Sequence, residues 1–136
     1  MVCLYCGAKT EVVNSRPQKR VNQIWRRRHC NGCDAVFTTN ERIDYSSAIV
    51  VKRNARLEPF DRDRLLISLA ASLGHRPSAV ADAAALVATI THTLVVAAKK
   101  GSVEAADITK EACAVLGRFD KLAAAHYSAY HSNVSS

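Results

Sequence analysis

Cys3-Leu4-Tyr5-Cys6 and Cys30-Asn31-Gly32-Cys33 are the two stretches that decide how the first third of this chain folds. In each stretch two residues separate the cysteines, so both sulfurs of one turn can reach a single ion. Four thiolates form the tetrahedral ligand set that zinc prefers, and they leave no coordination position open for catalysis. We therefore predict one structural Zn²⁺ per chain, bound by Cys3, Cys6, Cys30 and Cys33.

Two other fates for these cysteines are two disulfides and an iron site of the rubredoxin type. The N-terminus has neither a basic region nor an apolar core, so we expect no secretory signal and a reducing cytoplasm, where disulfides are rare. Redox chemistry at iron would not explain the neighbouring arginines. Gly7 and Gly32 stand where such knuckle turns often need a positive φ.

Composition divides the chain near residue 45. The whole chain has 136 residues, 19 Lys and Arg against 12 Asp and Glu, and a net charge of +7. Residues 1–45 hold four of the five cysteines and the only Trp, whereas residues 46–136 hold most of the alanines. No run approaches the ~20 uninterrupted apolar residues that span a bilayer, so we expect a cytoplasmic protein with an anionic partner and no membrane segment.

Periodicity predicts an α+β fold, with a small four-cysteine ribbon of short antiparallel strands in residues 1–45. Residues 46–136 are expected to form a mostly helical domain with an N-terminal β-hairpin. Expected strands cover 12–13, 23–29, 35–39, 47–53 and 56–58, the last two joined at Asn54-Ala55. Helices are expected after Asp61 and ending at Gly74, after Ser78, over about 105–116 with Phe119 facing inward, and over 122–131.

An arginine run, Trp25-Arg26-Arg27-Arg28-His29, comes directly before the second cysteine pair. Residues 1–33 hold seven Lys and Arg but one acid, a density whose usual counterpart is nucleic-acid phosphate. In a strand, Arg26 and Arg28 share one face and Arg27 lies on the other. A solvated basic face is the alternative, and charge does not decide between RNA and DNA.

The stretch from Ile49 to Asp61 combines the predicted hairpin with a helix start. Lys52 and Arg53 can neutralise a polyphosphate, Glu58 can accept from a sugar hydroxyl or an amine, and the helix N-terminus can add its amides. Ordinary surface charges around a hairpin are the alternative. The chain has neither a P-loop nor a Gly-x-Gly-x-x-Gly motif, and we see no catalytic Ser-His-Asp or Cys-His arrangement.

Together these motifs resemble a known family. Cys3-x-x-Cys6, Val13-Asn14-Ser15-Arg16, Arg26-Arg27-Arg28-His29-Cys30-x-x-Cys33 and Phe37-Thr38-Thr39-Asn40-Glu41-Arg42 resemble the zinc ribbon of NrdR repressors. Val51-Lys52-Arg53, Glu58-Pro59-Phe60-Asp61 and Leu65 resemble the opening of that family's ATP-cone, although Asn54-Ala55 replaces its usual Asp-Gly turn.

The resemblance implies a bacterial transcriptional repressor of ribonucleotide reductase genes, not an enzyme. Its zinc ribbon (1–45) would bind double-stranded promoter DNA. Its ATP-cone (46–136) would bind ATP or dATP as allosteric ligands that set the stoichiometry of a homo-oligomer, and hence DNA binding. The protein would be cytoplasmic and associated with the nucleoid when repressing.

The resemblance also implies which residues bind each partner. The implied DNA contacts are Arg16, Arg26, Arg27 and Arg28, and the implied nucleotide contacts are Val50, Lys52, Arg53, Glu58 and Arg64. The alternative function is a zinc-ribbon module associated with RNA or a polymerase, without nucleotide regulation.

Overall fold

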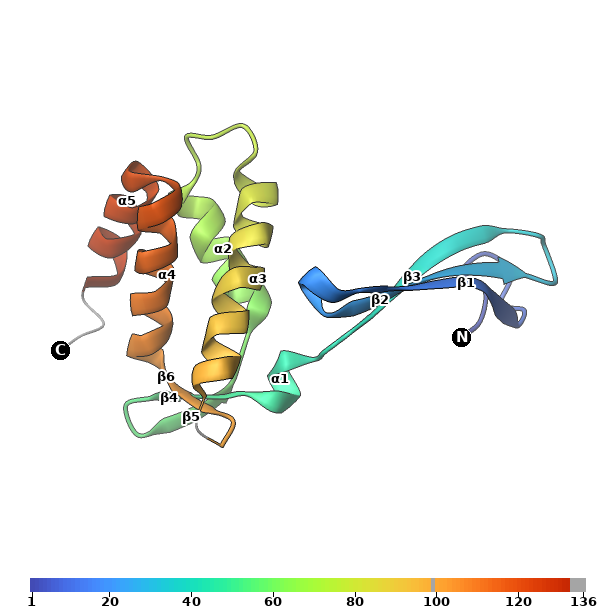
Figure 1. The fold of residues 1–136 in the computed structure, drawn as a ribbon, viewed down its shortest axis with the longest axis horizontal. Coiled ribbons are helices and arrows are strands. Elements are labelled where there is room, and N and C mark those ends of the chain that lie inside the picture. Colours follow the sequence, from blue (N-terminus) through green and yellow to red (C-terminus); the bar gives the residue numbers. More distant parts are fainter. Residues whose placement is uncertain (99, 133–136) are drawn as a thin grey trace. The chain divides into compact units, whose positions relative to one another are not determined.

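The chain folds as two compact units, Met1–Ile43 and Asp44–Ser136, each with a three-stranded sheet of its own. The structure is a computed structural model that describes residues 1–98 and 100–132 (Figure 1). The first unit is an antiparallel sheet beside a four-cysteine cluster, and the second is a mixed sheet with helices. The predicted α+β class is therefore confirmed.

Strands β1 (Thr10–Gln18), β2 (Gln23–Cys30) and β3 (Val36–Arg42) form the first sheet, in the order β1-β2-β3. A 3₁₀ turn over Lys19–Val21 and a left-handed Asn22 connect the first two strands. β1 is much longer than the expected 12–13, because eight of its residues pair with β2 although few of them favour a strand by themselves.

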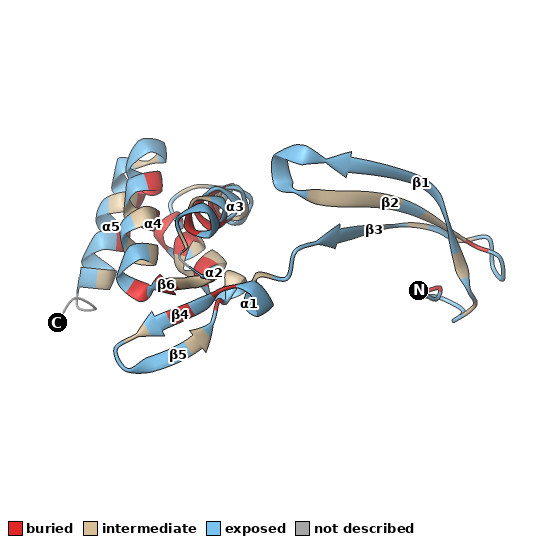
Figure 2. Cartoon of the chain, turned by 60° about the horizontal axis from the view of Figure 1, so that its bottom comes forward, coloured by how far each residue is buried: buried red, intermediate tan, exposed pale blue. Residues whose placement is uncertain are grey.

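The first unit has almost no hydrophobic core. Of residues 1–43, all of which the structure describes, only Cys3 and Cys30 are buried. β1 is exposed along nearly its whole length, as Figure 2 shows. A segment this short cannot fold on such burial alone, so the cysteines must supply the missing stabilisation.

The second unit is built from three strands and five helices within its described residues, and its sheet has the order β5-β4-β6. β4 is antiparallel to β5 and parallel to β6. The elements are α1 (Tyr45–Ala48), β4 (Val50–Arg53), β5 (Arg56–Pro59), α2 (Arg62–Ser72), α3 (Ala79–Ala97), β6 (Ser102–Glu104), α4 (Ala105–Phe119) and α5 (Lys121–His131).

A single apolar cluster fills the space between these helices and the sheet. The predicted α2 stripe is confirmed, since Leu65, Leu69 and Leu73 are all buried in that cluster. Each such leucine contributes roughly 1.5–3 kcal/mol by leaving water. Unlike the first unit, the second is therefore held together by ordinary core packing.

Several expected details of the second unit are wrong. Residues 47–48 belong to α1 rather than to a strand, because the Asp44 side chain caps a helical turn by accepting from the backbone N–H of Ser46 at 3.0 Å. Strand β6 was not expected at all, and it has only three residues. α2 ends at Ser72, with Leu73 as its C-cap, so Gly74 does not terminate it in a left-handed conformation.

Two side chains also act differently from the expectation. The Ser78 hydroxyl does not cap α3; it donates to the Asp82 carboxylate at 2.7 Å. Phe119 does not face inward but is 42% exposed. Its ring lies 4.8 Å from the guanidinium carbon of Arg76, so a cation–π contact replaces burial.

The β4–β5 turn departs from the usual Asp-Gly hairpin, as the sequence suggested. Asn54 takes a positive φ of 52°, whereas Ala55 does not. An asparagine tolerates the left-handed region, which a Cβ disfavours in alanine, so only the first central residue of this turn adopts it.

Helix α3 is long and apolar enough, by length and composition only, to cross a membrane. The mean hydropathy of its 18-residue window is 1.7, and 28% of that window is buried. One such helix is weak evidence for a membrane span, because core helices meet the same criterion. The buried side of α3 packs Leu86, Val87, Ile90 and Leu94 into the core.

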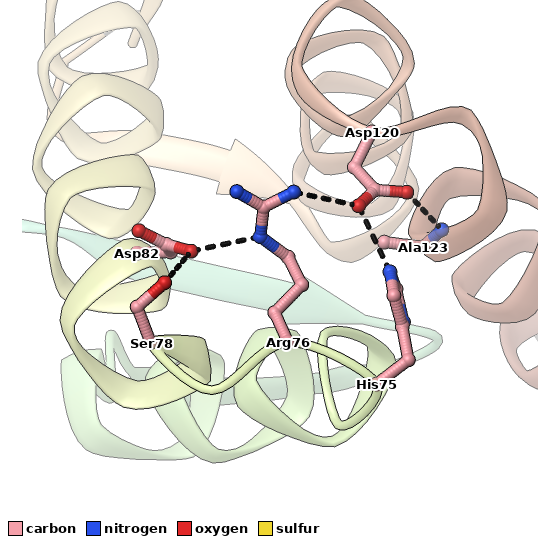
Figure 3. A network of polar contacts seen from close by, with 6 residues as sticks. All are labelled: His75, Arg76, Ser78, Asp82, Asp120 and Ala123. Atoms are coloured by element: carbon pink, nitrogen blue, oxygen red, sulfur yellow. Dashed lines mark hydrogen bonds and ion pairs between the residues drawn. The ribbon is translucent and has the colours of Figure 1, made fainter.

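A polar network ties the α2–α3 connection to the start of α5 (Figure 3). Arg76 donates from Nε to Asp82 at 2.9 Å and from Nη1 to Asp120 at 3.1 Å, and His75 Nε2 lies 2.9 Å from Asp120. The backbone N–H of Ala123, followed by His75 and Arg76, lowers the pKa of Asp120 to about 2. Asp120 therefore stays ionised and holds the first turn of α5 in place.

Candidate metal centre, basic face and nucleotide pocket

The four cysteines of the first unit converge on one point. Their sulfur atoms all lie within 4.8 Å of one another, with 3.7 Å between Cys3 and Cys33 and 3.5 Å between Cys6 and Cys30. A tetrahedral zinc with bonds of ~2.3 Å separates its sulfur ligands by about 3.8 Å. The thiol set therefore fits one structural zinc and has no place for a substrate on the metal.

The two cysteine pairs are held by equivalent backbone turns. Cys3 donates its N–H to Ala8 at 2.8 Å, and Cys30 donates to Ala35 at 2.9 Å. Gly7 donates back to the Cys3 carbonyl at 3.0 Å, in the same way that Asp34 donates to Cys30. Each knuckle is therefore a closed loop that presents its first cysteine to the four-cysteine cluster.

Backbone amides also favour the thiolate form of these ligands. The N–H of Tyr5 lies 3.4 Å from the Cys3 sulfur, and the N–H of Gly32 lies 3.3 Å from the Cys30 sulfur. Donation from the backbone of Cys6 and Tyr5 lowers the pKa of Cys3 to about 7. Zinc binds the deprotonated thiol, so these donors favour metal binding through Cys3 at neutral pH. Without a metal, the neighbouring Cys6 thiol raises the pKa of Cys33 to about 12, so not all four thiols are ionised together.

The prediction that Gly7 and Gly32 both take a positive φ is right for Gly7 and wrong for Gly32. Gly7 has a positive φ of 74°, as predicted, but Gly32 does not. Asp34, with φ 57°, occupies the equivalent left-handed position in the second knuckle. Gly32 is needed for space instead, since a Cβ there would lie 2.7 Å from the Cβ of Ala8 and 3.4 Å from the Cys6 sulfur.

One face of the first sheet is basic. Directly paired residues of antiparallel strands share a face, and Arg16 pairs with Trp25 while Arg42 pairs with Gln23. Alternation along β2 adds Arg27 to the same face. All three arginines are exposed, and none forms an ion pair within the described residues. We call Arg16, Arg27 and Arg42 the basic face.

Arg26 and Arg28 lie together on the opposite face, as the alternation predicts, and both are partly buried. Arg26 donates from Nη2 to Glu41 at 2.8 Å, and Arg28 donates from Nε to the hydroxyl of Thr39 at 3.0 Å. Neighbouring side chains therefore engage these two guanidinium groups, in contrast to those of the basic face.

A cavity of about 240 Å³ lies in the second unit where β4, β5, α2, α4 and α5 meet. Three of the predicted nucleotide residues line it together: Arg53, Glu58 and Arg64. Arg64 Nη1 lies 3.7 Å from a Glu58 carboxylate oxygen. The N-terminal turn of α2 borders the cavity through Asp61, whose carboxylate accepts from the backbone N–H of Arg64 at 2.9 Å.

The other two predicted nucleotide residues do not line this cavity. Val51 and Arg53 point into it, so strand alternation sends Val50 and Lys52 to the other side of β4, where both are exposed. The structure thus brings together three of the five and separates two.

Sequence reasoning missed residues at both sites. Arg42 joins the basic face through its register with Gln23, a position that required the strand pairing to be known. Ser68, Tyr127 and His131 line the cavity from α2 and α5. A histidine four residues after a tyrosine on an amphipathic helix was the only available signal, and it is weak.

Comparison with known proteins agrees with this architecture. Residues 1–41 match the model of the "Transcriptional repressor NrdR-like, N-terminal domain" family. The chain is 35% identical to the transcriptional repressor NrdR of Bordetella petrii over 134 residues, which is 98% of the chain and 84% of that protein.

Two shorter alignments are with the transcriptional repressors NrdR of Afipia carboxidovorans, 43% identical over 95 residues, and Symbiobacterium thermophilum, 42% identical over 77. They cover 69% and 57% of the chain, and 60% and 51% of those proteins.

The family match and the alignments place this chain, with its four-cysteine ribbon and separate helical unit, in a class of bacterial transcriptional repressors, which are not enzymes. The chain belongs to the NrdR family of transcriptional repressors. Bacterial DNA lies in the cytoplasm, so a bacterial transcriptional repressor acts there.

We predict that Gly32→Ala weakens zinc retention, because the added Cβ would lie 2.7 Å from the Ala8 Cβ and so shift the turn that holds Cys3. Zinc release to a chelator should be at least several-fold faster than in the wild type. Gly117→Ala is the matched control, since apart from the adjoining backbone of α4 nothing lies within 4 Å of its added Cβ. Equal release rates for the wild type and Gly32→Ala would contradict the prediction.

Proposed function

We propose that the first unit binds double-stranded promoter DNA of ribonucleotide reductase operons and that ATP or dATP in the cavity of the second unit controls homo-oligomerisation. Membership of a repressor family supports DNA as the nucleic acid. The observation that carries the nucleotide part is the convergence of Arg53, Glu58 and Arg64 on one cavity at a helix N-terminus. When repressing, the protein would be associated with the nucleoid.

The basic face supports the DNA part of the proposal. Its exposed arginines can donate bidentate bonds to phosphates or to guanine edges. Arg16 and Arg27 are the predicted contacts on this face, and Arg42 adds a third cation beside them. Arg26 and Arg28 stay in the proposal as contacts of the opposite face, with smaller effects expected because other side chains engage them.

Charge and hydrogen-bonding capacity support the nucleotide part. Arg53 Nε is buried without a hydrogen-bond partner among the described residues, so a bound anion would satisfy it. Glu58 can accept a hydrogen bond from the ligand's sugar, and Arg64 adds positive charge beside it. Val50 and Lys52, on the other side of β4, remain predictions from the resemblance alone.

A modest difference in binding free energy between ATP and dATP is enough to control repression. ATP and dATP differ by one 2′-hydroxyl, and a polar group left unpaired in a closed site costs about 1–3 kcal/mol. A coupling free energy of about 1–3 kcal/mol between binding and assembly shifts oligomer populations appreciably. An assembled oligomer then holds several ribbons on one promoter, where each further contact forms at high effective concentration.

For DNA, we expect Arg27→Ala to lower affinity for a promoter fragment about tenfold and to reduce the salt dependence by roughly one phosphate contact. Fluorescence anisotropy at several salt concentrations measures both. Arg118→Ala, an exposed arginine of α4, is the control and should bind like the wild type. Arg26→Ala should lose less than Arg27→Ala. An Arg27→Ala variant with wild-type affinity and salt slope would contradict the assignment.

For nucleotide, calorimetry on the full chain should detect binding of ATP and of dATP, and light scattering should show that the two ligands give different assemblies. Arg53→Ala should weaken binding at least tenfold, because it removes the charge that faces the cavity, while Arg118→Ala should not. If the wild-type protein gives no heat with either nucleotide, the alternative of an RNA- or polymerase-associated module without nucleotide regulation is favoured instead.

A further inference from the structure

The cavity that contains three of the predicted nucleotide residues has a second wall, which is formed by α5. Arg53 and Glu58 come from the hairpin β4–β5, whereas His131 is the last residue of α5 and lines the same cavity. The resemblance assigned no role to this part of α5. A ligand in the cavity could therefore contact side chains of α5 to which no function has been assigned so far.

The imidazole of His131 is held in a fixed orientation. Its Nε2 lies 2.9 Å from the hydroxyl of Ser68 on α2. The ring of Tyr127 lies 4.1 Å away, centroid to centroid, and the ring of Tyr130 lies 5.4 Å away in an edge contact. Nδ1 has no hydrogen-bond partner among the described residues. The ring is thus positioned by three side chains with one nitrogen available.

The charges around His131 come from several elements. Partial burial, followed by the positive charge of Arg53, lowers the pKa of His131 below its ordinary value, which favours the neutral ring. α4 contributes Ala105, Ile108 and Thr109 to the lining, none of which titrates. The titratable and charged groups that share the site are Arg53 of β4, Glu58 of β5, Asp61 and Arg64 at the start of α2, and Tyr127 and Tyr130 of α5.

An anion placed between Arg53 and His131 would resolve two features at once. It would accept a hydrogen bond from the buried, unpartnered Nε of Arg53. It would also reverse the electrostatic effect at His131, because a neighbouring negative charge favours the imidazolium form. A neutral acceptor could satisfy Arg53 Nε but would not favour the imidazolium form of His131.

We propose that His131 is a ligand-binding residue of this cavity. Its imidazole binds a phosphate group of the nucleotide, opposite Arg53, and takes up a proton when the nucleotide binds. The proposal rests on the proposed nucleotide function of the cavity and adds a residue and a pH dependence to it. The sign follows from linkage: a pKa that is higher in the complex than in the free protein makes binding tighter as pH falls. One proton changes the affinity by at most about tenfold per pH unit.

The test is calorimetry of the full chain with ATP between pH 6 and pH 8, in two buffers of different ionisation enthalpy. Mg²⁺ is kept in excess so that the γ-phosphate stays ionised throughout. We expect net proton uptake by the wild type and an affinity several-fold higher at pH 6 than at pH 8. His131→Gln, which can still bond to Ser68, should bind with little pH dependence and several-fold more weakly at pH 6.

Two further variants separate binding from a structural role. His131→Lys carries a fixed positive charge, so it should retain strong binding at pH 8, where His131→Gln is weak. His126→Gln is the matched control, because His126 lies on the same helix, bonds to Ser72 Oγ at 3.2 Å and does not line the cavity. It should keep the wild-type pH profile.

The possible outcomes separate the role of His131 from the proposed nucleotide function of the cavity. ATP binding whose pH profile and proton uptake are the same in His131→Gln as in the wild type overturns the role of His131 and leaves the nucleotide site standing. No ATP binding by the wild type at any pH overturns the nucleotide site, and the role of His131 with it.

Discussion

The convergence of four cysteine sulfurs, in a set that fits one zinc ion, is the interaction on which the first unit depends. Its 43 residues bury only Cys3 and Cys30, and a three-stranded sheet with so little burial is not stable by itself. Structural zinc contributes roughly 10–16 kcal/mol in zinc-finger peptides, more than enough to replace the missing core. Because Cys30 is the last residue of β2, a bound metal would also fix the end of that strand, and with it the register that places Arg27 on its face.

The second unit is stabilised in the opposite way, by an apolar core, and this difference suits the proposed division of labour. Its cavity lies between the β4–β5 hairpin and α5, and the ionised Asp120 fixes the start of α5. A ligand that bridges Arg53 and His131 would join elements from the two ends of the unit. Such a ligand can bias how copies of the chain assemble without altering the metal-bound sheet, because the two units have separate stabilising interactions.

Sequence predicted the features that depend on short spacing. The cysteine pairs indicated the metal cluster, the leucine period placed α2, and strand alternation separated Arg27 from Arg26 and Arg28. Prediction from the sequence failed where contacts between distant segments of the chain determine the structure. β6 exists only because it pairs with β4, and Phe119 stays exposed beside Arg76, a contact that comes from the α2–α3 connection. His131 reaches the cavity only after α5 packs against α2, which no local pattern encodes.

Hydrogen–deuterium exchange of the full chain, with and without a zinc chelator, tests the central claim most directly. The account predicts that metal removal abolishes amide protection in β1, β2 and β3 while α2, α3 and α4 remain protected. Unchanged protection in the three strands after complete zinc removal would contradict it, because the first unit would then have a source of stability other than its metal.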